Sequence, residues 1–411
     1  MFYDIIVVGG GVAGVAAAVQ AGRAGLKVAL IEKTALLGGL ASSGLINVFL
    51  PICDGNGTQV SFGICEEMLR RSLKYGPGEI PPGWRGERNA EERKRFISVF
   101  SPASLVLSLD EMLEEANVTV YLDTLVCDVR LEQNQISGIA VENESGRFEI
   151  GASQFIDCSG SAVLGRKLDM PLITGENYLS LWALELVNGK LEMNYGAVYG
   201  NGALTNKFCD EALDEAGISK SYLAETKQFG TSGKQVSEYL LKTRAYLRGY
   251  YRYMYKNNLA DRETLFPVKL PIMPQYRKIY AIKAATMMSD NQDWTYIDDS
   301  VGLVADWRRA GLVWEIPYGS LYSNSGPDNL LFAGRCMGAG GDAWEVMRVI
   351  PSAVVTGQAA GLAAVLSLRD KISPRKLSCK KLQKELNSLQ IPLHFNQLGI
   401  SKPCQKKNPM Q

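Results

Sequence analysis

The sequence predicts an α/β protein built on a parallel β-sheet, with an antiparallel β-meander and an inserted α+β segment. Three observations support this fold class. A strand–glycine turn–helix–strand unit opens the chain over residues 2–33, strand-like segments with polar turns fill residues 118–160, and a further strand enters a glycine turn over residues 328–341. Strands separated by helices form parallel sheets, whereas strands joined by tight turns form antiparallel ones. We therefore expect both arrangements in this chain.

The first unit contains the glycine pattern G-x-G-x-x-G. Ile5 to Val8 is a continuous apolar run, typical of a parallel strand that is buried on both faces, and Val12 to Ala24 reads as a helix of small residues. Between them, Gly9 permits a tight turn, Gly11 lets a pyrophosphate touch the backbone, and Gly14 lets the helix pack closely on the strand. The amides and the positive dipole end at the helix start then face the phosphates.

An acidic residue completes this unit. Glu32 ends the second predicted strand, Lys27 to Ile31, where a carboxylate can accept hydrogen bonds from both hydroxyls of an adenosine ribose. The alternative is a glycine turn that binds nothing, and the agreement of strand, helix and acid disfavours it. The sequence therefore predicts a dinucleotide at this turn.

Later segments supply the remaining elements. We expect a helix from Pro102 to Ala116, and then a β-meander with turns at residues 134–135 and 145–146 that ends in a buried strand at residues 155–157. A polar stretch at residues 81–96 is part of a possible lid at residues 75–100.

The sequence predicts three helices in the second half of the chain. Val236 to about Asn257 has apolar residues at spacings of three and four, which favours a helix covering a substrate domain. A second helix starts just after Pro351. The basic stretch at residues 373–389 reads as a short helix in the C-terminal tail.

The composition is that of an ordinary globular protein. The 411 residues are 46% hydrophobic and 21% charged, and 44 basic against 43 acidic residues leave a net charge of +1. This balance favours neither nucleic acid nor an acidic membrane surface as a partner. The most apolar run, Ala353 to Leu366, is short for a membrane span, and Asp4 and Gly9 interrupt any signal-like N-terminus. We expect a cytoplasmic protein with no nucleic acid and no membrane partner.

Metal and histidine chemistry have little support. The eight cysteines form no C-x-x-C pair, the spacing that zinc and iron–sulfur sites commonly use. The single histidine, His394, lies far out in the C-terminal tail, so the usual catalytic base is nearly excluded. We expect no metal site.

The motifs together resemble the two-dinucleotide-binding-domain flavoproteins with the glutathione-reductase-like FAD fold. Within that family the chain resembles the FAD-dependent oxidoreductase subgroup. The resemblance runs from Tyr3 to about Leu368 and is weakest from Leu168 to about Phe266. Its marks are "IIVVGGGVAGVAAA", "IEKTALLGGLASSGL", "FIDCSGSAVLG", "YRKIYAIKAAT", "IPYGSLYS", "DNLLFAGRCMGAGG" and "RVIPSAVVTGQAAGLAAVL". The last two, in this order near the C-terminus, are the most specific.

The resemblance implies a domain organisation. A Rossmann-like FAD-binding domain would comprise a parallel sheet and the meander, with an α+β substrate or cap domain inserted into it. The implied parts are residues 1–167 (FAD-binding), 168–291 (substrate or cap), 292–370 (the C-terminal return of the FAD-binding domain) and 371–411 (helical tail).

The resemblance also implies where FAD binds. The glycine turn would hold the pyrophosphate, Glu32 the ribose and the backbone of Val126 the adenine edge. The helix after Pro351 would point its N-terminus at the flavin pyrimidine, where a helix dipole favours the anionic reduced form. The implied cofactor-binding residues are Gly9, Gly11, Val12, Ala13, Gly14, Glu32, Lys33, Gly38, Gly39, Leu40, Ala41, Val126, Gly160, Gly334, Arg335, Pro351 and Ser352.

Catalytic candidates must be found without the histidines that relatives carry. Neither residues 337–343 nor the stretch "VADWRRAGLVWE" at residues 304–315 contains one. Arg348 could bind a substrate carboxylate or stabilise reduced flavin, or it could simply pair with Glu345. Asp342 could act as acid or base, or cap a glycine loop. Tyr318 could donate a proton, although most such tyrosines are packing residues.

The resemblance implies an FAD-dependent oxidoreductase. It would take a hydride from a small organic substrate, or deliver one, and exchange electrons with an unknown acceptor. We expect the substrate between the flavin face and the middle segment of the chain. Two alternatives stay open. One is an NAD-dependent dehydrogenase, which the C-terminal return to the cofactor disfavours, and the other is a flavin-binding RNA-modification or binding protein without its own turnover.

Overall fold

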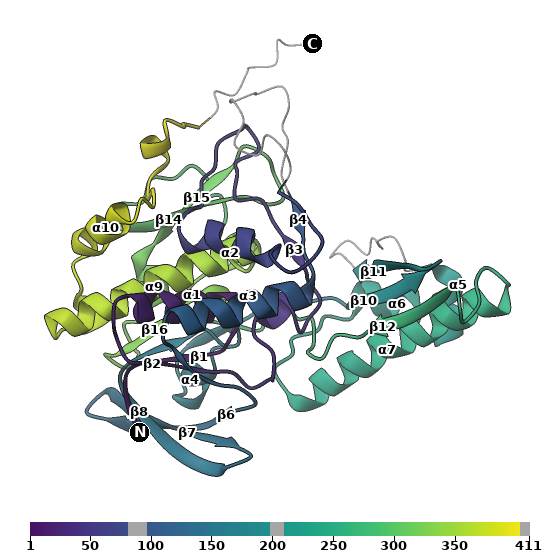
Figure 1. The fold of residues 1–411 in the computed structure, drawn as a ribbon, viewed down its shortest axis with the longest axis horizontal. Helices are drawn as coiled ribbons and strands as arrows, with labels where there is room; N and C mark the ends of the chain where they lie inside the picture. The colour runs from purple at the N-terminus through teal and green to yellow at the C-terminus, as the bar shows by residue number, and fades with distance from the viewer. Residues whose placement is uncertain (81–96, 198–208, 403–411) are drawn as a thin grey trace. The chain divides into compact units, whose positions relative to one another are not determined.

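The chain forms two compact units. The structure, a computed structural model, describes residues 1–80, 97–197 and 209–402, so the core of the predicted lid, residues 81–96, lies outside the described residues. Unit 1 contains Met1–Gly38, Asn47–Ile173 and Ala281–Gln411, and unit 2 contains Gly39–Ile46 and Thr174–Tyr280. Figure 1 labels most of their helices and strands.

A seven-stranded sheet forms the centre of unit 1. Its order is β5–β2–β1–β8–β7–β6, and β16 also pairs with β8. The parallel strands are β1 (Phe2–Val8), β2 (Val28–Ile31), β5 (Thr119–Tyr121), β8 (Gly146–Asp157) and β16 (Leu330–Phe332), and the antiparallel ones are β6 (Leu125–Glu132) and β7 (Gln135–Asn143). The parallel sheet and the meander that the sequence predicts are therefore both confirmed.

Strand β8 belongs to both parts of this sheet. Near its start, Gly146 to Ile150 pairs with the antiparallel β7. Towards its end, Phe155 to Asp157 lies between the parallel strands β1 and β16. The end of β8 is buried on both faces, which explains its run of apolar residues before Asp157.

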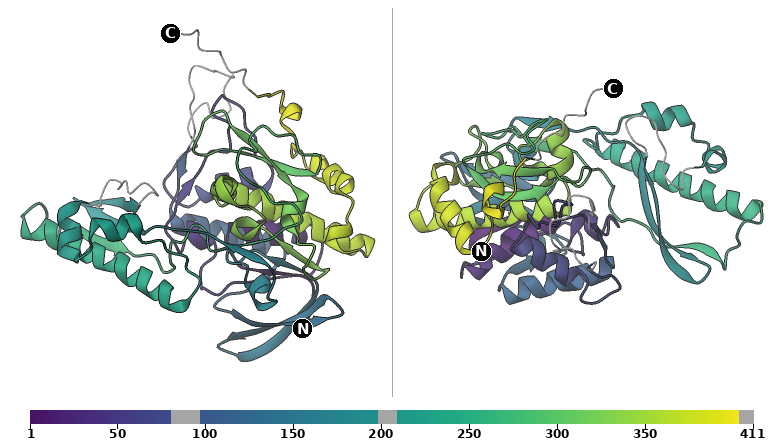
Figure 2. Two further views of the ribbon diagram at one scale, coloured as in Figure 1. Left: turned by 180° about the vertical axis from the view of Figure 1, so that it is seen from behind. Right: turned by 90° about the horizontal axis from the view of Figure 1, so that it is seen from above.

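Two helices of small residues pack against each other beside the sheet. They are α1 (Val12–Arg23) and α9 (Ile350–Asp370), purple and yellow-green in Figure 2. A Cβ added at Gly357 would lie 2.1 Å from the carbonyl oxygen of Ala13, and one added at Gly361 would lie 2.5 Å from that of Ala17. Glycine at both positions is therefore what lets the two backbones touch.

Helix α9 corrects one expectation from the sequence. The apolar run is a helix of 21 residues, longer than the Ala353 to Leu366 stretch, and by length and composition it could cross a membrane. However, 94% of its most apolar window is buried inside the protein. A helix that is apolar all round and covered by protein is typical of a core helix in a soluble fold.

Further elements complete unit 1. Helix α3 begins after Ser101, whose Oγ accepts the N–H of Ser104, and it ends one residue before the predicted Ala116. The other elements are α2 (Ile64–Ser72), α3 (Pro102–Glu115), α4 (Val163–Lys167), α8 (Gly341–Met347), α10 (Cys379–Ser388), the pair β3 (Val48–Phe49) and β4 (Ser98–Val99), and the hairpin β14 (Ser300–Ala305) and β15 (Val313–Pro317).

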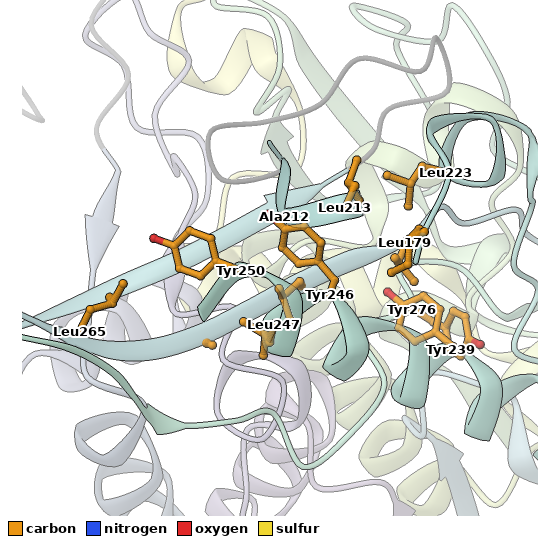
Figure 3. Close-up of a cluster of buried hydrophobic side chains, with 13 residues drawn as sticks. Leu179, Ala212, Leu213, Leu223, Tyr239, Tyr246, Leu247, Tyr250, Leu265 and Tyr276 are labelled. Carbon is orange, nitrogen blue, oxygen red and sulfur yellow. The ribbon is translucent and has the colours of Figure 1, made fainter. Parts of the chain in front are cut away.

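Unit 2 has its own core. A three-stranded antiparallel sheet in the order β11–β10–β12 is covered by α7, the helix predicted from Val236. Tyrosines of α7, among them Tyr239, Tyr246 and Tyr250, pack with leucines in the cluster shown in Figure 3. The chain enters this unit within β9 and leaves it within β13. The elements are β9 (Leu172–Thr174), β10 (Ser180–Val187), β11 (Lys190–Ala197), α5 (Asp210–Ala216), α6 (Lys220–Glu225), α7 (Gly233–Lys256), β12 (Leu265–Lys269) and β13 (Tyr280–Ile282).

The contact between α1 and α9 gives a first prediction. Gly357→Ala should lower the free energy of unfolding by about 1–3 kcal/mol in urea denaturation, because the added methyl group meets the Ala13 carbonyl. Gly233→Ala in α7 is the control, since a Cβ there meets no atom within 4 Å. If both variants keep wild-type stability, the two helices are not in backbone contact.

Candidate functional site

The predicted glycine turn joins β1 to α1. Gly9 has a φ of 101°, and a Cβ added at Gly14 would lie 1.8 Å from the carbonyl oxygen of Gly9, so both positions require glycine. At Gly11 a Cβ would meet no atom within 4 Å. No side chain caps α1 at Gly11. The turn thus presents open backbone at a helix N-terminus, which is what an anion such as pyrophosphate needs.

Glu32 lies beside this turn and is buried. Its Oε2 accepts the N–H of Gly10 at 2.7 Å, and its Oε1 accepts both the N–H and the hydroxyl of Thr34 at 2.9 Å. The carboxylate is therefore fixed next to the turn, and its neighbour Lys33 is exposed. Sequence reasoning missed Thr34, whose only signal is a hydroxyl two residues after the acid.

The segment after β2 returns to the turn. The N–H of Gly38 donates to the carbonyl of Gly10 at 2.8 Å, and Gly38 pairs with Gly11 in an isolated parallel bridge. The next predicted residues, Gly39, Leu40 and Ala41, form the 3-10 helix η1 (Gly39–Ala41), which belongs to unit 2.

A second glycine turn follows β16. Gly334 opens the 3-10 helix η3 (Gly334–Cys336) with a φ of 71°, and Arg335 follows it. A Cβ added at Gly160, the residue predicted on the adenine side, would lie 2.6 Å from Nη2 of Arg335. The guanidinium therefore lies directly on the backbone of Gly160. Val126 is in β6, paired with Val141 and buried.

Positive charge gathers between this turn and the start of α9. Desolvation lowers the pKa of Arg335 to about 10, and the guanidinium of Arg348 lowers it as well, since two like charges oppose each other. Pro351 and Ser352 lie in the first turn of α9, where the Ser352 hydroxyl donates to the carbonyl of Val346 at 2.7 Å. Two guanidiniums next to a helix N-terminus form a surrounding that fits an anionic group.

Arg348 forms the ion pair with Glu345 that the sequence left open as an alternative, and its side chain is mostly buried. Its Nε and Nη2 donate to Oε2 of Glu345 at 2.7 and 2.5 Å, and its side chain is 14% exposed. Its guanidinium carbon lies 5.7 Å from the ring centre of Trp307, whose Nε1 donates to the Glu345 carbonyl. An ion pair and an aromatic ring thus hold this arginine in a defined orientation.

The other two catalytic candidates are engaged in structural contacts. Asp342 lies in the first turn of α8, where it forms ion pairs with Arg308 and Arg309. Tyr318 is buried in the 3-10 helix η2 (Tyr318–Leu321), and its hydroxyl donates to the carbonyl of Pro374 at 2.8 Å. Burial raises the pKa of Tyr318 well above its usual value, and its proton is already committed to a backbone acceptor.

Sequence reasoning missed the ionic network to which Asp342 belongs. Arg308 bridges Asp342 and the buried Asp306, and Trp314 donates to Asp306 as well. Burial opposes ionisation of Asp306, but the hydrogen bonds and charge of Arg308 outweigh it and lower the pKa of this carboxyl. The network ties the β14–β15 turn to α8. The run Asp306–Arg309 was its signal, but sequence alone does not pair it with Asp342.

Comparison with known proteins finds a matching family and similar solved structures. The model of the family described as FAD dependent oxidoreductase matches residues 4–180 and 303–386. A geranylgeranyl bacteriochlorophyll reductase-like protein from Thermoplasma acidophilum is 14% identical, with 94% of this chain and 83% of that chain covered and a TM-score of 0.47. A p-nitrophenol 4-monooxygenase from Pseudomonas putida is 10% identical, with coverages of 94% and 84% and a TM-score of 0.42. No curated protein matches the chain.

The open backbone at Gly11 gives a second prediction. Gly11→Leu should fold as the wild type does but purify without FAD, because the side chain would occupy the space above the backbone that a pyrophosphate needs. The FAD content is measured by absorbance after denaturation, and folding by circular dichroism. Gly14→Ala should instead impair folding itself. Full FAD occupancy in Gly11→Leu would show that the pyrophosphate binds elsewhere.

Proposed function

The chain belongs to the FAD dependent oxidoreductase family, and from this premise we propose that it transfers a hydride between a small organic substrate and FAD. The family match favours neither an NAD-dependent dehydrogenase nor a flavin-binding protein without turnover. One observation carries the proposal for where FAD binds: the turn at Gly11 has room above its backbone, with the Glu32 carboxylate fixed beside it. Bound FAD supplies the redox chemistry of the reaction.

We assign the protein's own contribution to three groups. The backbone of the Gly9–Gly14 turn would bind the pyrophosphate, and Glu32 would accept the hydroxyls of the adenosine ribose. Arg335 and the N-terminus of α9 would supply positive charge. The remaining assignments from the sequence, including Val126 and Gly160, are part of the same proposal.

Arg348 is our candidate for stabilising the reduced cofactor. It lies two residues before α9 begins, close enough to Arg335 to affect the pKa of that residue. A fixed guanidinium here would favour negative charge on reduced flavin and could also orient an acidic substrate group. The engaged contacts of Asp342 and Tyr318 give less support to a proton-transfer role for either, and hydride transfer to flavin does not require one.

The remaining assignments are also proposals. Unit 2, with its separate core, would be the substrate domain. A net charge of +1 and the burial of α9 support a cytoplasmic enzyme whose partners are a small substrate and an electron acceptor, without nucleic acid or membrane.

The proposed function is tested by following reduction of the bound flavin in the absence of oxygen. Purified holoprotein is mixed with a panel of organic metabolites, and loss of the oxidised flavin's visible absorption reports reduction. Bleaching by one chemical class would identify the substrate. Absence of bleaching with every donor, together with co-purifying nucleic acid, would instead support a binding role without turnover.

The ribose assignment gives a third prediction. Glu32→Ala should weaken FAD binding by about 1.5–3 kcal/mol for each charged hydrogen bond lost, measured as the dissociation constant in fluorescence titrations. Because Glu32 also holds Thr34, the control is Thr34→Val, which removes a hydroxyl donor and leaves the carboxylate in place. An unchanged dissociation constant in Glu32→Ala would contradict the assignment.

Arg348 gives a fourth prediction. Arg348→Met should lower the reduction potential of the bound flavin and slow its reduction, while FAD stays bound, because a positive charge near the reduced form is lost. Glu345→Gln should shift the potential in the opposite direction, since it removes the carboxylate that partly neutralises Arg348. A potential that stays at the wild-type value in both variants would rule out this role.

A further inference from the structure

Thr356 presents a fully buried hydroxyl group in the second turn of α9. Its Oγ1 accepts the N–H of Gly334 at 3.0 Å and can donate to the carbonyl of Ser352 at 2.9 Å or Ala353 at 3.0 Å. A threonine inside a helix often bonds to a carbonyl of the preceding turn, and such a bond is purely local. The bond from Gly334 is different, because it comes from a residue 22 positions away on another element.

The residue that Thr356 holds cannot shift easily. Gly334 has a φ of 71°, and a Cβ there would lie 2.9 Å from the Cβ of Ala13, so the turn is pressed against the first turn of α1. The N–H that it donates to Thr356 is buried. A buried amide without an acceptor costs free energy, so the hydroxyl fixes where this turn lies along α9.

The turn in question carries Arg335. Its guanidinium lies on the backbone of Gly160, and its carbonyl accepts Nε1 of Trp344 at 2.8 Å. Gly160 and Trp344 therefore contact Arg335 from the β8 end and from α8, and Thr356 holds the neighbouring Gly334 from α9. Of the three, Thr356 links the turn to the helix whose N-terminus bears partial positive charge.

We propose that Thr356 is a positioning residue for FAD. It locks the Gly334–Arg335 turn onto α9, so that the guanidinium and the positive end of the helix keep a fixed spacing towards an anionic part of the cofactor. This inference rests on the proposed function, because it takes the FAD site assigned above. Threonine is suited to this task, since its hydroxyl accepts and donates at once while its methyl group packs in the apolar interior.

The test compares three variants of the holoprotein. Thr356→Val keeps the side-chain shape and removes the hydroxyl, whereas Thr356→Ser keeps the hydroxyl. Ser367→Ala is the matched control, because Ser367 is another fully buried hydroxyl on α9, and its Oγ has no hydrogen-bond partner among the described residues. The readouts are FAD released on serial dilution, the midpoint potential of the bound flavin and the thermal unfolding temperature.

Thr356→Val should weaken FAD binding by about tenfold, as expected for one unsatisfied buried donor near the ligand, and should lower the flavin potential. Thr356→Ser and Ser367→Ala should both keep the FAD affinity and the flavin potential at wild-type values. If Thr356→Val lowers the unfolding temperature while FAD release and potential stay at wild-type values, the residue is structural and the inference is wrong. If Thr356→Val does not fold, Thr356→Ala carries the same comparison. Wild-type protein that binds no FAD would overturn the proposed function instead.

Discussion

Backbone contact without intervening side chains is the constraint on which unit 1 depends. Gly14 lets the start of α1 touch the turn after β1, and Gly357 and Gly361 let α9 touch α1. Because protein interiors are close-packed, a methyl group at any of these positions would move a whole helix. This close approach places the N-terminal half of α9 beside the start of α1, next to the Gly9–Gly14 turn. Both glycine turns and the start of α9 thus share one region, although the first turn lies more than 300 residues before the other two in the sequence.

Charge in this region is arranged as a set of paired and partly opposed groups. Glu345 forms an ion pair with Arg348, and Asp306 and Asp342 form ion pairs with Arg308. Burial and the charge of Arg348 both lower the pKa of Arg335. The lowered pKa of Arg335 means that its charged form is less stable here than in water. The carboxylates anchor the surrounding turns, whereas the proposed role of Arg335 rests on an anion bound beside it.

Local patterns explain what the sequence could predict. The β1–α1–β2 unit follows from a continuous apolar run, glycine spacing and a terminal acid, and the meander follows from polar turns between strands. The family assignment holds, whereas the finer glutathione-reductase-like assignment and the domain boundaries stay predictions. Thr34 escaped notice because a lone hydroxyl two residues after an acid is a weak signal. The ion pair of Asp342 with Arg308 and the bond of Thr356 with Gly334 escaped notice because the partners lie far apart in the sequence. The inclusion of residues 39–46 in unit 2 has the same cause.

Strand β8 and helix α9 also determine when the protein can become stable during its synthesis. The end of β8 needs β16 on one side, and the side of α1 that contacts α9 stays uncovered until α9 has been made. At ribosomal rates of roughly 5–20 residues per second, the apolar face of α1 waits on the order of tens of seconds for its partner. Contacts of such long sequence separation also slow folding. During this interval the apolar surface that α9 later covers is exposed, and exposed apolar surface favours aggregation of a nascent chain.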